Sequence, residues 1–290
     1  MQILKNLEKN ISLHSSIKIE NLIITPIVLN EFYHNDKIVS FDTLFDSHLA
    51  EAKEVSDEGI VSRINIINKS KNFLFITDGE AIVGAKQNRI SERSVILNEV
   101  SETIIPVYCV ERGRWGYRNN RDFSKSEFSI SPKSRDRKAE FLKHKEDSYI
   151  QSMVWQDVDE LSQKNASYSS TSDLGEVLNS KNYDYAIDEF KDIAFNGFIV
   201  SGSGRPFIEI FSDKENSKKQ LNKSIKTWLA DQNNVQESII DPNSCLRQFL
   251  NSSWSIDDSI GLEKAFNADG LNNGRSIFLD DKIIHSYFYL

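Results

Sequence analysis

Two short polar runs hold the side chains that are best suited to chemistry in this sequence. Residues 84–89 read Gly-Ala-Lys-Gln-Asn-Arg, and residues 109–115 read Cys-Val-Glu-Arg-Gly-Arg-Trp. Each run follows an apolar segment with the pattern of a β-strand. A chain that needed only to fold would rarely place so many long polar side chains at two strand ends so close in sequence. We therefore interpret the two runs as the rim of one site.

The first run offers several kinds of hydrogen-bond donor for an anionic ligand. Lys86 provides a point charge, Gln87 and Asn88 provide amides, and Arg89 provides a planar fork suited to phosphate or carboxylate. Gly84 allows close backbone approach. The run is not a P-loop, because the pattern G-x-x-x-x-G-K-[ST] is absent. The alternative is an exposed hairpin corner with solvated charges.

The second run combines guanidinium groups with a large aromatic ring. Arg112 and Arg114 could hold an anion, while Trp115 could stack on a base or sugar. The alternative for Trp115 is an ordinary position in the core. Cys109 lies within an apolar segment, which favours a small buried residue over a nucleophile.

Glu111 and Asp78 are the leading candidates for acid–base work, and Glu80 and His285 are weaker ones. Each has a simpler interpretation: Glu111 pairs with an arginine, Asp78 and Glu80 lie in a solvated turn around Gly79, and His285 is a buried, hydrogen-bonded histidine. The five histidines and two cysteines match no metal-ligand spacing. The sequence therefore predicts neither a metal nor a cofactor.

Residues 112–138 carry nine basic and three acidic side chains in a chain of net charge −8. Several glycine and asparagine residues interrupt regular structure, so a long basic loop is expected. Nucleic-acid binding is possible but not favoured, because the chain as a whole is acidic. A small polyanionic ligand fits at least as well. A surface for an acidic protein partner and a merely solvated loop remain alternatives.

The spacing of apolar residues predicts an α+β fold with mixed or mainly antiparallel sheets and packed helices. Five strands are expected between residues 61 and 110, which is too short a stretch for parallel strands with helical crossovers. Residues 17–30 predict a strand that breaks at Pro26 or lies at a sheet edge. A helix is expected over residues 42–55. Others are expected within 134–163, 185–193, 214–230 and 243–250.

The same patterns predict two lobes that share one interface. Residues 1–133 would form a β-rich N-terminal lobe, 134–180 a helix and a serine-rich linker, and 181–290 an α+β C-terminal lobe. No apolar run approaches the ~20 residues of a membrane helix. The N-terminus lacks the apolar core of a signal peptide. A cytoplasmic protein without a membrane partner is expected.

The two polar runs resemble the ARPP-type domain, a family named for its association with ADP-ribosylglycohydrolase and rhodanese-phosphatase proteins. The similarity continues through Gln151 and Trp155, the segment 209–211, and the closing residues Ile284 and His285, so that it spans about residues 17–289. The family has no settled activity that the resemblance could assign to this chain. It implies a setting in nucleotide-linked conflict or repair systems, such as antiviral defence.

From these observations we expect a binding module for a small phosphorylated ligand, either a nucleotide or an ADP-ribose-like molecule. Arg89 and Arg114 would hold phosphates, and Trp115 would stack on a ring of the ligand. Gln87 and Asn88 would form hydrogen bonds with the polar edges of the ligand. One alternative is a hydrolase or transferase on the same ligand class, with Glu111 or Asp78 as general base. Another is a protein-interaction subunit that uses residues 112–138.

Overall fold

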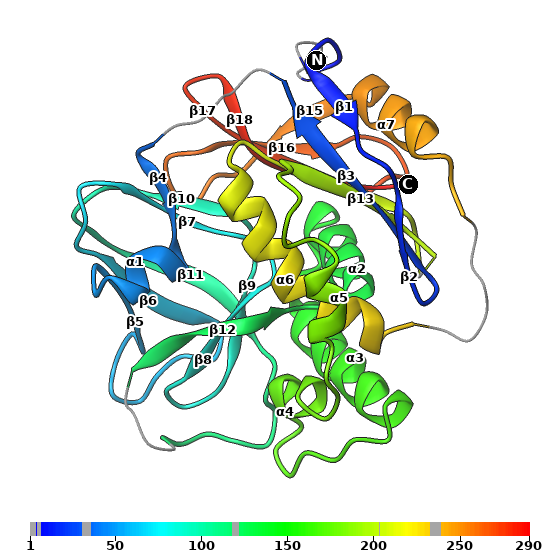
Figure 1. Cartoon of the computed structure of the whole chain (residues 1–290). Coiled ribbons are helices and arrows are strands. Elements are labelled where there is room, and N and C mark those ends of the chain that lie inside the picture. Colours follow the sequence, from blue (N-terminus) through cyan, green and yellow to red (C-terminus); the bar gives the residue numbers. More distant parts are fainter. Residues whose placement is uncertain (1–3, 5–6, 31–35, 118–121, 203, 233–238) are drawn as a thin grey trace. The chain divides into compact units, whose positions relative to one another are not determined.

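Antiparallel strands dominate the computed structural model of the chain. It describes residues 4, 7–30, 36–117, 122–202, 204–232 and 239–290, and these form seven α-helices and eighteen strands (Figure 1). The expected α+β class with mainly antiparallel sheets is confirmed. Among the described residues, no helix has the length and apolar character needed to cross a membrane.

Backbone contacts group the chain into two units. The first comprises Met1–Asn35, Tyr183–Ser259 and Glu263–Leu290, and the second comprises Asp36–Asn182 and Ile260–Leu262. The first unit is therefore discontinuous in sequence, whereas the pattern of residue types had suggested boundaries near residues 133 and 180. The physical reason is strand pairing, because the N-terminal strand β3 pairs with β13, which lies beyond residue 180.

The first unit is built on one nine-stranded sheet with the order β1-β3-β13-β14-β18-β17-β16-β15, in which β2 also pairs with β3. Its strands are β1 (Ile11–Leu13), β2 (Ile17–Ile19), β3 (Leu22–Leu29), β13 (Gly197–Ser201), β14 (Phe207–Phe211), β15 (Trp254–Asp257), β16 (Lys264–Ala268), β17 (Gly274–Leu279) and β18 (Lys282–Tyr289). Its helices are α5 (Asp184–Asp188), α6 (Lys214–Ala230) and α7 (Pro242–Asn251).

Pro26 neither breaks β3 nor marks a sheet edge, so that expectation was wrong. The residue lies inside β3, in register with Phe198 of β13. On the other flank, β1 pairs with residues 27–29 and β2 with residues 22–24. The Pro26 carbonyl accepts a hydrogen bond from the His14 backbone N–H at 2.9 Å. Pro26 therefore faces the junction between two short strands, where its missing N–H leaves no ladder partner unpaired.

The second unit contains a six-stranded sheet, β12-β8-β9-β11-β6-β5, and a three-stranded sheet, β10-β7-β4, in which β4 and β7 are parallel. Its strands are β4 (Ile38–Ser40), β5 (Ala50–Lys53), β6 (Arg63–Asn68), β7 (Phe73–Ile76), β8 (Glu80–Gly84), β9 (Arg89–Ser91), β10 (Val95–Leu97), β11 (Ser101–Cys109) and β12 (Phe123–Ser129). Its helices are α1 (Phe41–Asp46), α2 (Pro132–Lys143), α3 (Ile150–Lys164) and α4 (Leu174–Leu178), and a short 3-10 turn (Asp147–Tyr149) precedes α3.

The helix expected over residues 42–55 is less than half as long, since α1 has six residues. Ser40, and not Asp42, is the N-cap, since its side chain accepts a hydrogen bond from the Thr43 N–H. His48 has a φ of 58°, a left-handed conformation that ends the helix. The chain then forms β5, whose Ala50 and Ala52 are buried. Alternation of small and charged residues over 50–53 favours a strand that pairs with β6.

Residues 112–138 are not one basic loop. Residues 123–129 form β12, which pairs with β8, and residues from Pro132 onward form the first half of α2. Ser131 caps α2 by accepting a hydrogen bond from the Ser134 N–H, and a proline at the first helical position suits this start. The basic side chains of Arg135 and Lys138 are buried, not solvated. Arg118 and Arg121, which were counted in the same loop, lie outside the described residues.

Candidate functional site

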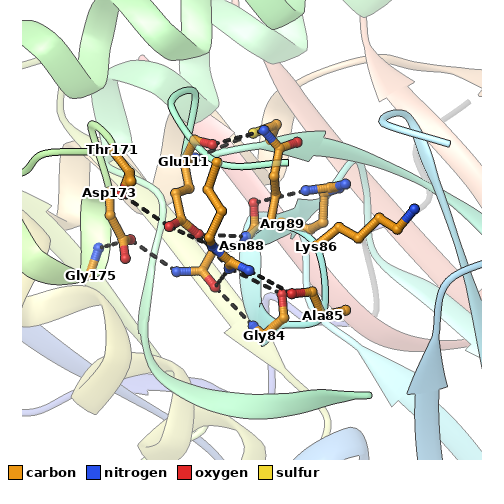
Figure 2. Close-up of polar contacts among 12 residues, drawn as sticks. Gly84, Ala85, Lys86, Asn88, Arg89, Glu111, Thr171, Asp173 and Gly175 are labelled. Carbon is orange, nitrogen blue, oxygen red and sulfur yellow. Dashed lines mark hydrogen bonds and ion pairs between the residues drawn. The ribbon is translucent and has the colours of Figure 1, made fainter. Parts of the chain in front are cut away.

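Three segments of the second unit meet around Glu111, as Figure 2 shows. The first two segments correspond to the two polar runs: residues 84–89 begin at the last residue of β8, and residues 110–116 directly follow β11. Pairing of β9 with β11 places Arg89 opposite Cys109. The third segment, residues 169–175, lies alongside the second: the Leu174 N–H donates to the Val110 carbonyl at 3.0 Å and the Gly113 N–H donates to the Thr171 carbonyl at 2.8 Å. The two predicted runs therefore do lie together.

Gly84 allows the sharp turn that starts the first segment. Its φ is +117°, and a Cβ at this position would lie 3.0 Å from the Asp122 carbonyl oxygen. The turn is closed by a side chain from its far end, since the Gly84 N–H donates to Asn88 Oδ1 at 2.8 Å. Only glycine satisfies both the left-handed backbone and the close approach of the neighbouring chain.

Glu111 is fully buried, and both of its carboxylate oxygens are occupied. Oε1 accepts from Arg114 Nε at 2.8 Å and from Thr171 Oγ1 at 3.0 Å. Oε2 accepts from Arg114 Nη2 at 2.6 Å and from the Asn88 backbone N–H at 3.1 Å. Of the two interpretations offered by the sequence, pairing with an arginine is the one observed. The fork-to-fork geometry is the strongest form of this ion pair.

The remaining donors of Arg114 are used inside the protein as well. Nη1 donates to the carbonyls of Ala85 and Gly116, and Nη2 also lies 3.3 Å from the Gly84 carbonyl and 3.4 Å from Asn88 Oδ1. Arg114 therefore connects the first two segments. A phosphate could use this guanidinium only by displacing contacts that hold the site together.

Asp173 joins the third segment to the same cluster, and sequence analysis missed it. Its Oδ1 accepts from Asn88 Nδ2 at 3.0 Å and from the Gly175 N–H at 2.9 Å, so it also caps α4. Burial and the neighbouring charge of Glu111 raise the pKa of the Asp173 carboxyl. Asp173 lies in the stretch that was interpreted as a serine-rich linker. The sequence does contain a signal for a helix start at Asp173, because Glu176 follows three residues later, at the spacing of a capping box.

Arg89 differs from Arg114 in having almost no partners. Its side chain is fully buried, yet Nε and Nη2 have no hydrogen-bond acceptor. Nη1 makes one long contact of 3.5 Å with the Asn88 carbonyl. No carboxylate of the described residues lies within 4.0 Å of this guanidinium, and burial lowers its pKa. Gln87 has a similar deficit: its Nε2 donates to the Glu111 carbonyl at 3.0 Å, but its buried Oε1 has no partner.

Trp115 and Lys86 form the outer part of the site. Trp115 is 48% exposed, so its alternative interpretation as a core residue was wrong. Lys86 Nζ lies 5.3 Å from the centroid of the Trp115 ring, and the Arg89 guanidinium carbon lies 5.6 Å from it. Lys86 Nζ also donates to the Glu58 carbonyl at 2.6 Å. Two cations therefore lie beside one half-exposed aromatic ring. Asn88, in the same run, is buried.

Arg112 and Asp78 have partners of other kinds. Arg112 makes an exposed ion pair with Asp159 of α3 at 3.0 Å, and exposed pairs of this type contribute little. Asp78 Oδ1 pairs with Lys138 Nζ at 2.8 Å, and both side chains are fully buried. The interpretation of Asp78 and Glu80 as a solvated turn was therefore wrong. Glu80 is also buried, and its carboxylate accepts from the Thr77 N–H.

His285 belongs to the first unit and has its own partner. Its Nε2 lies 2.9 Å from Glu209 Oε1, and both side chains are buried. This agrees with the interpretation of His285 as a satisfied, buried histidine. Across the part of the chain that the structure describes, no group of three or more His, Cys, Asp and Glu side chains is arranged to hold a metal ion.

Cys109 lies opposite Arg89 in the pair of β9 and β11 and is fully buried. Its backbone N–H and carbonyl both bond to the side-chain amide of Gln151, at 2.8 and 2.9 Å. Burial raises the pKa of the Cys109 thiol, and it raises that of Cys245 to about 12. Because a thiolate is the reactive form, both residues fit the predicted role of small buried side chains.

We expect both thiols to be unreactive in the native protein. At pH 8, a thiol reagent such as DTNB should label neither cysteine during the time in which it labels both in guanidinium chloride. Burial blocks the reagent, and the raised pKa values keep the thiolate population small. Rapid release of one equivalent from the native protein would contradict this expectation. The variants Cys109→Ser and Cys245→Ser would then identify the reactive residue.

The sequence model of one known family matches residues 10–289 and thus nearly the whole chain. The family is ARPP-1, the ARG and Rhodanese-Phosphatase-superfamily-associated Protein domain. The comparisons found no significant match among curated proteins or solved structures.

Proposed function

The chain belongs to the ARPP-1 family, and from that premise we propose that it is a binding module for a small phosphorylated ligand, either a nucleotide or an ADP-ribose-like molecule. The match over residues 10–289 confirms the resemblance drawn from the two polar runs. The family's description places it in association with other proteins and names no ligand. The support for a ligand therefore comes from the chemistry of the site.

The unpartnered cation Arg89 is the observation that carries this proposal. Burying a charge costs several kcal/mol unless a counter-ion and hydrogen bonds offset the loss of water. Arg89 is fully buried, and two of its three nitrogens have no acceptor. A ligand anion would provide both the charge and the acceptors. Phosphate matches the guanidinium fork in geometry as well as in charge.

The surroundings of Arg89 suit the same ligand. Lys86 adds a second positive charge beside the half-exposed ring of Trp115. We assign the phosphate to Arg89 with help from Lys86, and the ring of a base or sugar to the exposed part of Trp115. Arg114 and Asn88 keep the segments in place and have no free donor for a phosphate. Because the guanidinium is buried under Trp115, the ligand has to displace that ring or Lys86 to reach it.

The second candidate function is a hydrolase or transferase acting on the same ligand class. The observation in its favour is the buried pair of carboxylates, Glu111 and Asp173, which are joined through Asn88. The raised pKa of Asp173 would suit a proton donor. Glu111 and Asp78 are both held by cations, so Asp173 replaces them as the residue to test. Loss of turnover in Asp173→Asn with binding retained would support this function.

A role for residues 112–138 in docking an acidic partner has weaker support. That segment is divided between β12 and α2, and its residues Arg135 and Lys138 are buried. We therefore do not extend this alternative.

The test is a thermal-shift screen with nucleotides, cyclic dinucleotides, NAD and ADP-ribose, followed by chromatography of each mixture. A ligand at ~100 times its Kd should stabilise the protein by about 2.7 kcal/mol. A shift with the ligand intact would establish binding, whereas consumption of the ligand would establish an enzyme. The absence of any shift or consumption would overturn the proposal.

Replacing Arg89 with methionine gives a sharper prediction. We expect Arg89→Met to abolish the ligand-induced shift and to raise the stability of the ligand-free protein by at least about 1 kcal/mol, because an unpaired buried charge is removed. The matched control is Arg112→Met, which removes an exposed arginine. The control should keep ligand binding and should change stability by less than about 0.5 kcal/mol. Retained binding in Arg89→Met would count directly against the assignment of the phosphate to Arg89.

A further inference from the structure

Two acceptor oxygens near Arg89 are also without partners. One is Gln87 Oε1, and the other is Oε2 of Glu54, the first residue of the loop between β5 and β6. Glu54 is held in place through its other oxygen, since Oε1 accepts from the Lys86 N–H at 3.2 Å. Sequence analysis did not single out Glu54. It is brought to the site by the backbone of the first polar run.

Neither acceptor pairs with Arg89. Glu54 lies near enough for its charge to favour the charged form of Arg89, which opposes the effect of burial on the pKa of that arginine. Gln87 precedes Arg89 by two residues in the same polar run. In Figure 2, Arg89 and Lys86 lie on the opposite side of the run from Asp173.

Gly59 lies directly beside the unpartnered oxygen of Glu54. A Cβ at this glycine would lie 3.0 Å from Glu54 Oε2 and 3.3 Å from Lys86 Cδ, and its φ is +72°. A side chain at residue 59 would therefore crowd both groups.

A ligand that contacts all of these unpartnered groups needs two kinds of chemistry. Arg89 requires an acceptor, and an inorganic phosphate could provide it. The same phosphate would give no stable hydrogen bond to Gln87 Oε1, and it would place negative charge beside the carboxylate of Glu54. Both oxygens require donors, and hydroxyl groups are neutral donors that meet this requirement without repulsion.

We propose that Glu54 and Gln87 form a hydroxyl-binding subsite next to Arg89, and that the ligand is a phosphorylated sugar, not inorganic phosphate or an alkyl phosphate. The inference rests on the proposed function, because it assigns the phosphate of that ligand to Arg89. It adds the requirement that hydroxyl groups on the same molecule donate to Glu54 Oε2 and Gln87 Oε1. Glu54 thereby selects against polyphosphates that carry no sugar.

The test compares ribose 5-phosphate with ethyl phosphate, a monoester without hydroxyl groups, by titration calorimetry. The wild-type protein should bind ribose 5-phosphate at least tenfold more tightly. The variant Glu54→Gln keeps the contact with Lys86 but replaces the free oxygen by an amide donor. In this variant the preference for ribose 5-phosphate over ethyl phosphate should fall below about threefold, while the affinity for ethyl phosphate is unchanged or increased. Glu58→Gln is the matched control, an exposed neighbour that should keep the preference. Gln87→Met removes the second acceptor and should reduce the preference in the same direction.

The outcomes separate this inference from the proposed function. Equal binding of both monoesters by the wild type, abolished in Arg89→Met, would overturn the hydroxyl subsite and leave the phosphate site standing. Binding of unphosphorylated ribose that depends on Glu54 but not on Arg89 would support the subsite and overturn the phosphate assignment. If neither monoester binds, both proposals fail. Melting curves of each variant should show that the protein is still folded.

Discussion

Replacing Arg114 with methionine is expected to lower the free energy of unfolding by about 3–5 kcal/mol. The variant would remove the two-pronged ion pair from the fully buried carboxylate of Glu111, and the carbonyls of Ala85 and Gly116 would lose their donor. The same residue holds the two polar runs together, so the loss includes their relative position. Guanidinium chloride denaturation of the purified variant and the wild type would measure this difference.

A double-mutant cycle would show that the loss comes from the ion pair. Glu111→Gln should also destabilise, but the double variant Glu111→Gln/Arg114→Met should be more stable than the sum of the single effects by more than about 1 kcal/mol, because neither charge is then left alone. Arg112→Met, two residues away and exposed, is the matched control. A loss of less than about 1 kcal/mol for Arg114→Met would contradict the structural role of this arginine.

The second large effect is expected at Lys138, whose ammonium group pairs with Asp78 in a fully buried position. Lys138→Met should lower the free energy of unfolding by about 3–5 kcal/mol, because it removes the counter-ion that lies 2.8 Å from the buried carboxylate of Asp78. Burial lowers the pKa of Lys138 itself. Chemical denaturation at pH 7 would measure the loss.

Lys133→Met is the matched control, because Lys133 lies on the same helix and makes an exposed ion pair with Glu160. It should change the free energy of unfolding by less than about 0.5 kcal/mol. A loss of less than about 1 kcal/mol for Lys138→Met would contradict a stabilising role of the buried pair.

Arg89 and Arg114 illustrate how two residues of one type can have opposite roles. Both are buried next to the same loop, but Arg114 has acceptors for its donors and Arg89 has acceptors for few of them. Their replacement is therefore expected to change stability in opposite directions. A residue that destabilises the free protein is a candidate for function, because the ligand can supply the missing interaction.

Local patterns in the sequence were sufficient for the class of fold and for many of its elements. Apolar periodicity placed α6 at Lys214–Ala230 and predicted β14 at Phe207–Phe211, as observed. The short spacing of apolar runs between residues 61 and 110 predicted an antiparallel or mixed sheet, and the strands of this stretch do pair antiparallel with one another. The two polar runs lie together because each adjoins a strand of the antiparallel pair β9 and β11. These features depend on residues that are close in the sequence, so the spacing of residue types is sufficient to predict them.

The partners of the charged residues were decided only by the tertiary structure. Arg89 and Arg114 look alike in the sequence, and Asp78 finds Lys138 sixty residues away. Asp173 reaches Asn88 across eighty-five residues from a stretch that resembles a linker. Local spacing carries no information about which distant segments are buried together. Burial decides which charges must be paired, and among the described residues Arg89 is a buried cation that has few acceptors.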